Sequence, residues 1–204
     1  MKPEYWDRAM RALARRDPVM AGIIRRYPRI HLVARGDPFH TLARSIVGQQ
    51  ISVKAAQSVW NRFSALVPVV SPGPVLKIKA KDLRACGLSE RKCEYIFDLA
   101  RRFIDGAVHV HRWPQMSDEE VIADLIQVRG IGRWTAEMFL MFNLLRPDVF
   151  PLADLGLRKG IRRAYFKREV SLRTMARLGE NWRPWRSVAT WYLWRSLDPL
   201  PVEY

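Results

Sequence analysis

Hydrophobic residues recur at helical spacing along most of the chain, and no run shows the strict alternation that predicts a strand. Tyr95, Leu99 and Phe103, for example, fall on one face of a single predicted helix. The pattern predicts an all-α fold of some ten helices, at about residues 4–15, 18–27, 38–66 with a protruding turn at 48–52, 81–86, 89–106, 117–127, 133–145, 154–165, 172–182 and 184–197.

Several helix ends carry recognisable boundary residues. Asp37 is a plausible N-cap before Pro38, and Ser117 with Glu120 has the spacing of a capping box. Gly87 suits the C-terminal end of the helix that precedes it. Residues 67–80 contain several prolines and a glycine, and this composition predicts a loop.

Gly130-Ile131-Gly132 interrupts two strongly apolar helical runs. Two glycines in three residues weaken a helix by about 2 kcal/mol relative to alanine, so we expect a very short turn here. The amides of Gly130, Gly132 and Arg133 would then lie at the N-terminus of the next helix, which is a ready anion site. A nucleic-acid phosphate fits such a site. The alternative is a tight helical hairpin with a glycine C-cap and no ligand.

Charge favours the nucleic-acid interpretation. The 204 residues carry a formal net charge of +15, and 27 of the 35 basic residues are arginine, whose planar fork binds phosphate bidentately. The alternative is a solvated basic face.

No run of 18 apolar residues predicts a membrane span, and the start "MKPEYWDRAM" does not resemble a signal peptide. We therefore expect a cytoplasmic protein that contacts the nucleoid through DNA.

Asp154 follows Gly132 by 22 residues, about one helix and a loop. An aspartate at a helix start is usually only an N-cap. In a DNA-binding protein a second role is compatible with the first. An ionised carboxylate facing a sugar C1′ can stabilise an oxocarbenium-like transition state and orient water for attack.

Four segments in order resemble the helix-hairpin-helix/Gly-Pro-Asp DNA glycosylase superfamily, and more narrowly the DNA-3-methyladenine glycosylase II family. They are "SIVGQQISVKAAQSVWNRF", "GLSERKCEYIFDLARRF", "LIQVRGIGRWTA" with "VFPLADLGLRKG", and "WRPWRSVATWYLWR". The resemblance implies one domain of two helical lobes, about 38–145 and about 1–37 plus 146–204, with the active site in the cleft between them. It also implies hydrolysis of the N-glycosidic bond of damaged bases in double-stranded DNA, with Asp154 as the catalytic carboxylate.

The same resemblance suggests roles for further residues. Trp134 and Trp194 match the family's base-stacking positions. Because a base in duplex DNA must be flipped out, the turn at "GQQIS" is expected to fill the gap. We expect Gln50 to be the wedge, with Gln49 and Ile51 beside it. The alternative is that Gln49 and Gln50 form only a polar junction between two helices. The expected DNA-binding hairpin consists of Gly130, Ile131, Gly132, Arg133 and Thr135.

No cofactor is expected to be required. The resemblance implies a sodium or potassium ion on backbone carbonyls near Val128, Gly130 and Ile131. Some members carry an N-terminal β domain, and we expect none here because these residues leave no room for one. The chain also has only Cys86 and Cys93, too few for an iron–sulfur cluster. We expect a monomer.

Two alternatives and one mechanistic expectation accompany this interpretation. The chain could act on uracil, hypoxanthine or an oxidised purine, or it could be a non-catalytic DNA-binding module. Bifunctional members of the superfamily attack C1′ with a lysine two residues after the second hairpin glycine, and that position here is Trp134. The nearest downstream lysine is Lys159. We therefore expect water as the nucleophile and an intact abasic site as the product.

Overall fold

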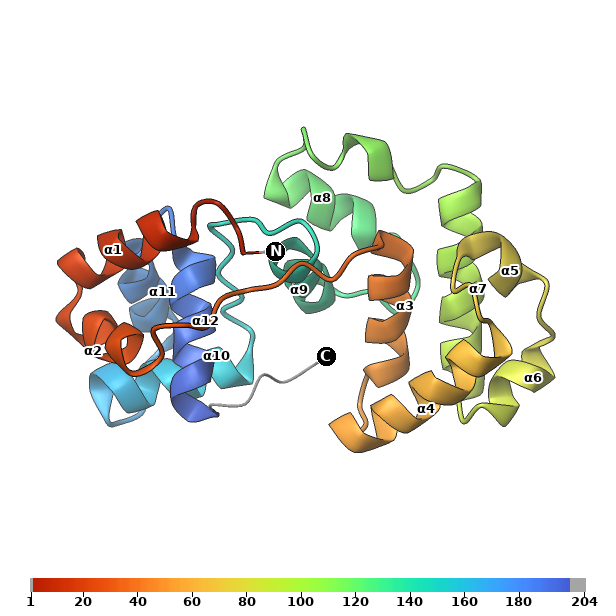
Figure 1. Ribbon diagram of the computed structural model, residues 1–204, viewed down its shortest axis with the longest axis horizontal. Coiled ribbons are helices and arrows are strands. Elements are labelled where there is room, and N and C mark those ends of the chain that lie inside the picture. The colour runs from red at the N-terminus through yellow and green to blue at the C-terminus, as the bar shows by residue number, and fades with distance from the viewer. Residues whose placement is uncertain (1, 199–204) are drawn as a thin grey trace. The chain divides into compact units, whose positions relative to one another are not determined.

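The structure is a computed structural model that describes residues 2–198. This part of the chain contains twelve α-helices, one 3₁₀ turn and one π turn, and no strand. The predicted all-α fold class is confirmed (Figure 1). The described residues form two compact units, 35–139 and 2–34 with 140–198. We call them the hairpin unit and the aspartate unit. The predicted lobe that ends at residue 204 extends beyond the described residues.

The hairpin unit is built around α7, which packs against α3, α5 and α6. Its interior is aromatic, with Phe39, Phe63 and Trp113 at most 2% exposed. Its helices are α3 (Pro38–Gly48), α4 (Val53–Leu66), α5 (Pro72–Leu76), α6 (Ala80–Ala85), α7 (Glu90–Ile104), α8 (Asp118–Leu125) and the first part of α9 (Arg133–Phe142), with a 3₁₀ turn at Val110–Arg112.

Two of the predicted helix starts in this unit are confirmed by side-chain caps. The Asp37 carboxylate accepts a hydrogen bond from the His40 amide, 2.8 Å away. Ser117 and Glu120 form a complete capping box, in which each side chain accepts from the other's backbone amide. These contacts satisfy amides that have no partner within the helix. Short polar residues therefore set where α3 and α8 begin.

The prediction that residues 67–80 form a loop was wrong in part, because α5 occupies Pro72–Leu76. Both Pro72 and Pro74 lie in the first turn of α5. Amides of the first turn have no acceptor within the helix, so proline costs little there. Val75 is fully buried and fastens this short helix to the unit. The prolines of this segment therefore start a helix and do not exclude one.

The aspartate unit surrounds α12, which contacts α1, α2 and α10. Because neighbours cover it on several sides, α12 is buried around most of its circumference, from Ser187 to Leu193. The helices of this unit are α1 (Trp6–Arg16), α2 (Pro18–Arg26), the last residues of α9, α10 (Leu155–Ile161), α11 (Leu172–Glu180) and α12 (Arg186–Leu197), with a π turn at Arg162–Phe166.

Three predicted helices in this unit end early in the structure. Helix α10 ends at Ile161, where the π turn begins. Helix α9 ends at Phe142, three residues early, and the chain turns at Leu145 with a positive φ of 51°. Helix α11 ends at Glu180, before Trp182, whose buried indole donates to the Asp17 carboxylate 2.9 Å away. At the end of α11, a tertiary contact therefore overrides the local helical preference. Among the described residues, no helix has both the length and the apolar character that crossing a membrane requires.

Candidate functional site

The two hairpin glycines have different structural roles. Gly130 has a φ of +84°, and a Cβ added there would lie 2.1 Å from the Tyr95 ring, so the fold requires glycine. Gly132 has no positive φ, and nothing lies within 4 Å of a Cβ placed there. Gly132 is exposed. The fold gives no reason for glycine at 132, and the open space beside it allows a ligand to approach the backbone closely.

The residues after Gly132 form the first turn of α9, whose leading amides have no acceptor within the helix. Thr135 is buried, and Ile131 before this turn is also buried. The exposed Arg133 side chain pairs with Glu119 at 2.9 Å and with Glu137 at 3.2 Å. These carboxylates hold the pKa of the Arg133 guanidinium above its usual value. The guanidinium of Arg133 is therefore engaged within the protein, whereas the leading backbone amides of this turn have no acceptor within the helix.

Helix α7 anchors the start of the hairpin turn. The backbone amide of Arg129 donates to the Asp98 carboxylate 2.8 Å away, and the Arg129 side chain pairs with Glu94 at 2.8 Å. The ring of Tyr95, also on α7, occupies the space beside Gly130. Three side chains of α7 thus fix the position of Arg129 and Gly130, where the hairpin turn begins.

The predicted wedge lies in the turn between α3 and α4. Gln50 is exposed and has a φ of +58°, a left-handed conformation that is uncommon for a residue other than glycine. Ile51 is also exposed. Gln49 differs, because its side chain is half-buried and its amide donates to the Gly130 carbonyl 2.8 Å away. The two glutamines therefore have distinct surroundings.

Two of the three carbonyls expected to hold a cation accept a hydrogen bond within the protein. The Val128 oxygen accepts from the Ile131 amide at 3.0 Å, and the Gly130 oxygen accepts from Gln49. A carbonyl oxygen has two lone pairs, so each retains capacity for a hard cation. Among the described residues, no group of three or more histidine, cysteine or acidic side chains is arranged to hold a metal ion. A sodium or potassium ion on these backbone carbonyls stays a prediction.

Asp154 lies in the aspartate unit and is confirmed as the N-cap of α10. Its Oδ1 accepts from the Leu157 amide at 2.6 Å and from the Trp194 indole nitrogen at 2.8 Å. The residue is 9% exposed. Two donors on one oxygen fix the carboxylate in a single orientation, as an electrostatic catalyst requires.

Trp194 and Gly156 complete the surroundings of Asp154. The Trp194 ring is stacked on Phe142, with 6.1 Å between ring centroids and 8° between planes. A Cβ at Gly156 would lie 3.1 Å from Asp154 Oδ1 and 3.2 Å from the Trp194 ring. Glycine at 156 therefore leaves room for the pair. Sequence reasoning missed Phe142 and Gly156, and the one available signal was the glycine two residues after the acid.

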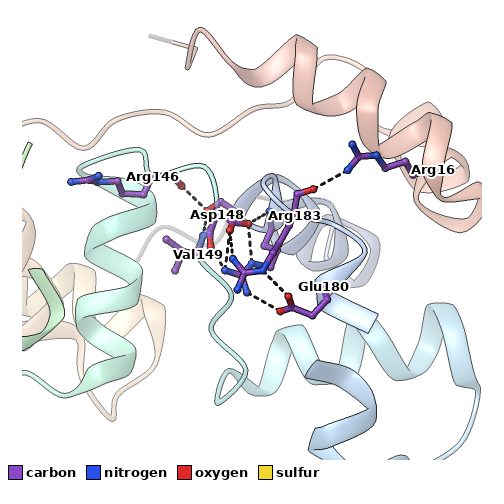
Figure 2. A network of polar contacts seen from close by, with 8 residues as sticks. Arg16, Arg146, Asp148, Val149, Glu180 and Arg183 are labelled. Carbon is purple, nitrogen blue, oxygen red and sulfur yellow. Dashed lines mark hydrogen bonds and ion pairs between the residues drawn. The ribbon is translucent and has the colours of Figure 1, made fainter. Parts of the chain in front are cut away.

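A polar network fastens the chain upstream of Asp154 to the start of α12. Figure 2 shows Asp148 at its centre, where the carboxylate accepts from Arg186 Nε at 2.8 Å and from Arg183 at 2.8 Å. The Ser187 hydroxyl donates to the Arg146 carbonyl at 2.6 Å and accepts from the Val149 amide. These contacts replace a local side-chain cap, which α12 lacks. Together with Trp194, they tie the link that carries Asp154 to both ends of α12.

Trp134 belongs to the hairpin unit, where it is the second residue of α9 and is partly exposed. The other six tryptophans are structural, because each is at least nine-tenths buried. They are Trp6, Trp60, Trp113, Trp182, Trp185 and Trp191. Trp134 and Trp194 are therefore the two tryptophans with ring surface left to offer a ligand.

A family model described as HhH-GPD superfamily base excision DNA repair protein matches residues 43–184. The chain belongs to this superfamily. The matched segment contains both the glycine hairpin and Asp154, and it ends shortly before α12.

Named relatives and a solved structure agree with this assignment. DNA-3-methyladenine glycosylase 1 of Schizosaccharomyces pombe is 35% identical over 78% of this chain and 72% of its own length. DNA-3-methyladenine glycosylase of Bacillus subtilis is 28% identical over 91% of this chain and 65% of its own. The S. pombe 3-methyladenine DNA glycosylase Mag1 in complex with abasic DNA superposes with a TM-score of 0.82, at 30% identity over 97% and 99% of the two chains. The chain spans 59% to 72% of the length of the first three curated relatives.

Proposed function

We propose that this chain is a monofunctional DNA N-glycosylase that hydrolyses the N-glycosidic bond of alkylated bases of the 3-methyladenine type. The observation that carries the proposal is the Asp154 carboxylate, held by the Leu157 amide and the Trp194 indole. The names of the relatives support the choice of substrate class. The reaction would begin base excision repair.

Asp154 acts on the charge that develops during bond cleavage. As the N-glycosidic bond lengthens, positive charge accumulates on the sugar C1′ and ring oxygen. A fixed carboxylate stabilises that charge without reorganisation, and it orients a water for attack on C1′. The bond from C1′ to the base breaks, and its electron pair leaves with the base, which neutralises a cationic alkylated purine. The bond from C1′ to the water oxygen forms, the water gives up a proton to solvent, and the product is an abasic site. Asp154 thus contributes mainly in the transition state.

The aromatic residues select the base. Trp134 and Trp194 offer ring surface, and N-alkylated purines carry a positive charge. A cation over an indole ring gains about 0.5–2 kcal/mol. Because ordinary bases are neutral, this attraction favours the alkylated base. Trp194 also donates to Asp154, so one residue couples recognition of the base to the position of the carboxylate.

The hairpin unit binds DNA through its backbone amides. The exposed Gly132 and the first amides of α9 bind a phosphate, which positions the duplex without reading its sequence. Gln50 enters the space that the flipped nucleotide leaves, with Ile51 beside it. A sodium or potassium ion on the carbonyls of Val128, Gly130 and Ile131 would add positive charge facing the same phosphate. DNA affinity measured at equal ionic strength in potassium chloride and in tetramethylammonium chloride tests for this ion.

The proposed partner is double-stranded DNA that contains a damaged base, bound by a monomer in the cytoplasm at the nucleoid. The net charge of +15 supports a polyanionic partner. Uracil, hypoxanthine and oxidised purines are second candidates, because pocket shape determines the choice of base. A non-catalytic DNA-binding module is the third.

The deciding experiment is a panel of duplexes that each contain one lesion, incubated with excess enzyme and assayed for base release. Asp154→Asn keeps the size of the side chain and removes its charge, so base release should fall by several orders of magnitude while DNA affinity stays within a few-fold. Release of only uracil or an oxidised purine would show that the chain acts on a different class of lesion. Release at near wild-type rate by Asp154→Asn would overturn the assignment of the carboxylate.

A further inference from the structure

Two segments assigned to DNA, the turn at 49–51 and the hairpin at 130–132, are joined directly inside the hairpin unit. The Gln49 side-chain amide donates to the Gly130 carbonyl across 2.8 Å. The two residues are 81 positions apart in the sequence. The Gln49 side chain is half-buried, whereas Gln50 is exposed. Gln49 thus points into the protein and Gln50 does not.

The Lys92 side chain also contacts the backbone of this turn. Its ammonium donates to the carbonyls of Val47 at 2.8 Å and Gln49 at 2.7 Å, at the C-terminal end of α3. Carbonyls at this end of a helix have no partner within the helix and favour a cation. The ammonium therefore fixes the backbone that immediately precedes Gln50.

One helix supports both segments. Lys92 and Tyr95 lie one turn apart on α7, and Tyr95 packs against Gly130. Asp98, one further turn along, accepts from the Arg129 amide. The turn and the hairpin are thus each fixed to α7, and the hydrogen bond from Gln49 closes the connection between them. Gln50 follows this anchored point in a left-handed conformation that permits little local freedom.

We propose that Gln49 is a positioning residue that sets the depth at which Gln50 enters the duplex when the hairpin is bound to a phosphate. The proposal rests on the proposed function, because it assigns Gln49 a part in base flipping by that same site. Without the Gln49 amide, the hairpin still binds phosphate, but Gln50 is no longer held at a fixed distance from it. Flipping then becomes less favourable, and release of a paired base slows.

The test uses Gln49→Met in the full chain, which keeps the length of the side chain and removes the amide donor. Gln57→Met is the matched control, because Gln57 is an exposed glutamine on α4 whose amide donates to Asn61. Single-turnover base release is measured on two duplexes, with the lesion opposite its normal partner or opposite an abasic-site analogue. In the second duplex, flipping costs less free energy because the lesion has no base-pairing partner. Thermal melting verifies that both variants are folded.

The expected result is a fall in the ratio of paired to unpaired rates by about three- to tenfold for Gln49→Met, the value of one hydrogen bond, and no change of ratio for Gln57→Met. The effect should largely vanish when Gln50→Ala is already present, because Gln49 acts through Gln50. An unchanged ratio, with or without an equal slowing on both duplexes, would overturn the positioning role. An undiminished effect in the Gln50→Ala background would overturn it as well.

Failure of the proposed function is distinguishable from failure of this inference. If the wild-type chain releases no base from any duplex, the glycosylase assignment fails. The positioning role is then read from 2-aminopurine placed next to the lesion, whose fluorescence rises when its neighbour is unstacked. A smaller rise with Gln49→Met than with Gln57→Met supports the role, and equal signals contradict it.

Discussion

Trp194 donates its indole N–H to the Asp154 carboxylate across 2.8 Å, and the two residues are 40 positions apart in the sequence. Asp154 is also the N-cap of α10, so its Oδ1 serves the fold and the candidate chemistry together. Because Trp194 stacks on Phe142, its ring cannot move freely away from the acid. The carboxylate is thus oriented by a side chain that is itself held in place.

Trp194→Phe should slow base release by about 10- to 100-fold, because a hydrogen bond to a charged group contributes about 1.5–3 kcal/mol. Phenylalanine keeps an aromatic face for the base and removes the N–H. Single-turnover release measures the effect. Trp60→Phe is the control, because Trp60 packs with His40 and Phe63 in the hairpin unit. If Trp194→Phe and Trp60→Phe retain equal rates, the indole does not support the acid.

Gly132→Val should weaken binding to damaged and undamaged duplex alike, because phosphate contacts carry no sequence information. The melting temperature should change little, since Gly132 has no positive φ and open space beside it. Gly130→Ala is the contrasting variant, and its Cβ would overlap the Tyr95 ring, so it should lower the melting temperature. Fluorescence anisotropy and thermal melting separate the two effects. Full DNA affinity in a folded Gly132→Val protein would remove the phosphate role.

Borohydride should trap no covalent complex between the enzyme and DNA. Lys159 is exposed on α10, five residues after Asp154, and Trp134 occupies the position where a lysine nucleophile would be expected. Strands should therefore break only after alkali is added to the reaction product. Denaturing gels with and without borohydride measure both outcomes. A strong adduct that disappears in Lys159→Ala would show that the chain is a lyase.

The aspartate unit should lose stability above about pH 10. Burial, followed by the hydrogen bond to Asp17, raises the pKa of Tyr165 above its ordinary value of about 10. Between pH 10 and that higher pKa, the unfolded chain loses the proton and the folded chain keeps it, so the free energy of unfolding falls as pH rises. Urea unfolding at pH 8 to 11 measures this slope. Tyr165→Phe should make the slope shallower without abolishing it, because burial also raises the pKa of Tyr5 and of Tyr192 in this unit. An identical slope in this variant would contradict the account.

Local sequence signals predicted the fold well where the signal and the contact lie within one turn of helix. Asp37, Ser117 and Asp154 each cap the helix that the sequence assigned to them. The all-α class and the superfamily were also predicted correctly. The helix α5 was missed because proline near a helix start and proline in a loop look alike in the sequence.

The surroundings of the site could not be predicted, because they are tertiary. Nothing near Asp154 in the sequence indicates that Trp194 donates to it, and nothing near Asp148 indicates the pairing with Arg186. The hydrogen bond from Gln49 to Gly130 likewise joins two motifs that the sequence suggested separately. Periodicity identifies which faces are buried, but it does not identify which buried faces meet.

The packing of Tyr95 against Gly130 limits how this protein can evolve. Two independent barriers oppose a side chain at 130, the ring itself and the φ of +84°, which costs an L-residue about 1–2 kcal/mol. A smaller residue at 95 would remove the first barrier and leave the second. A substitution at 95 alone therefore does not free position 130 for other residues, whereas the fold places no such limit on position 132.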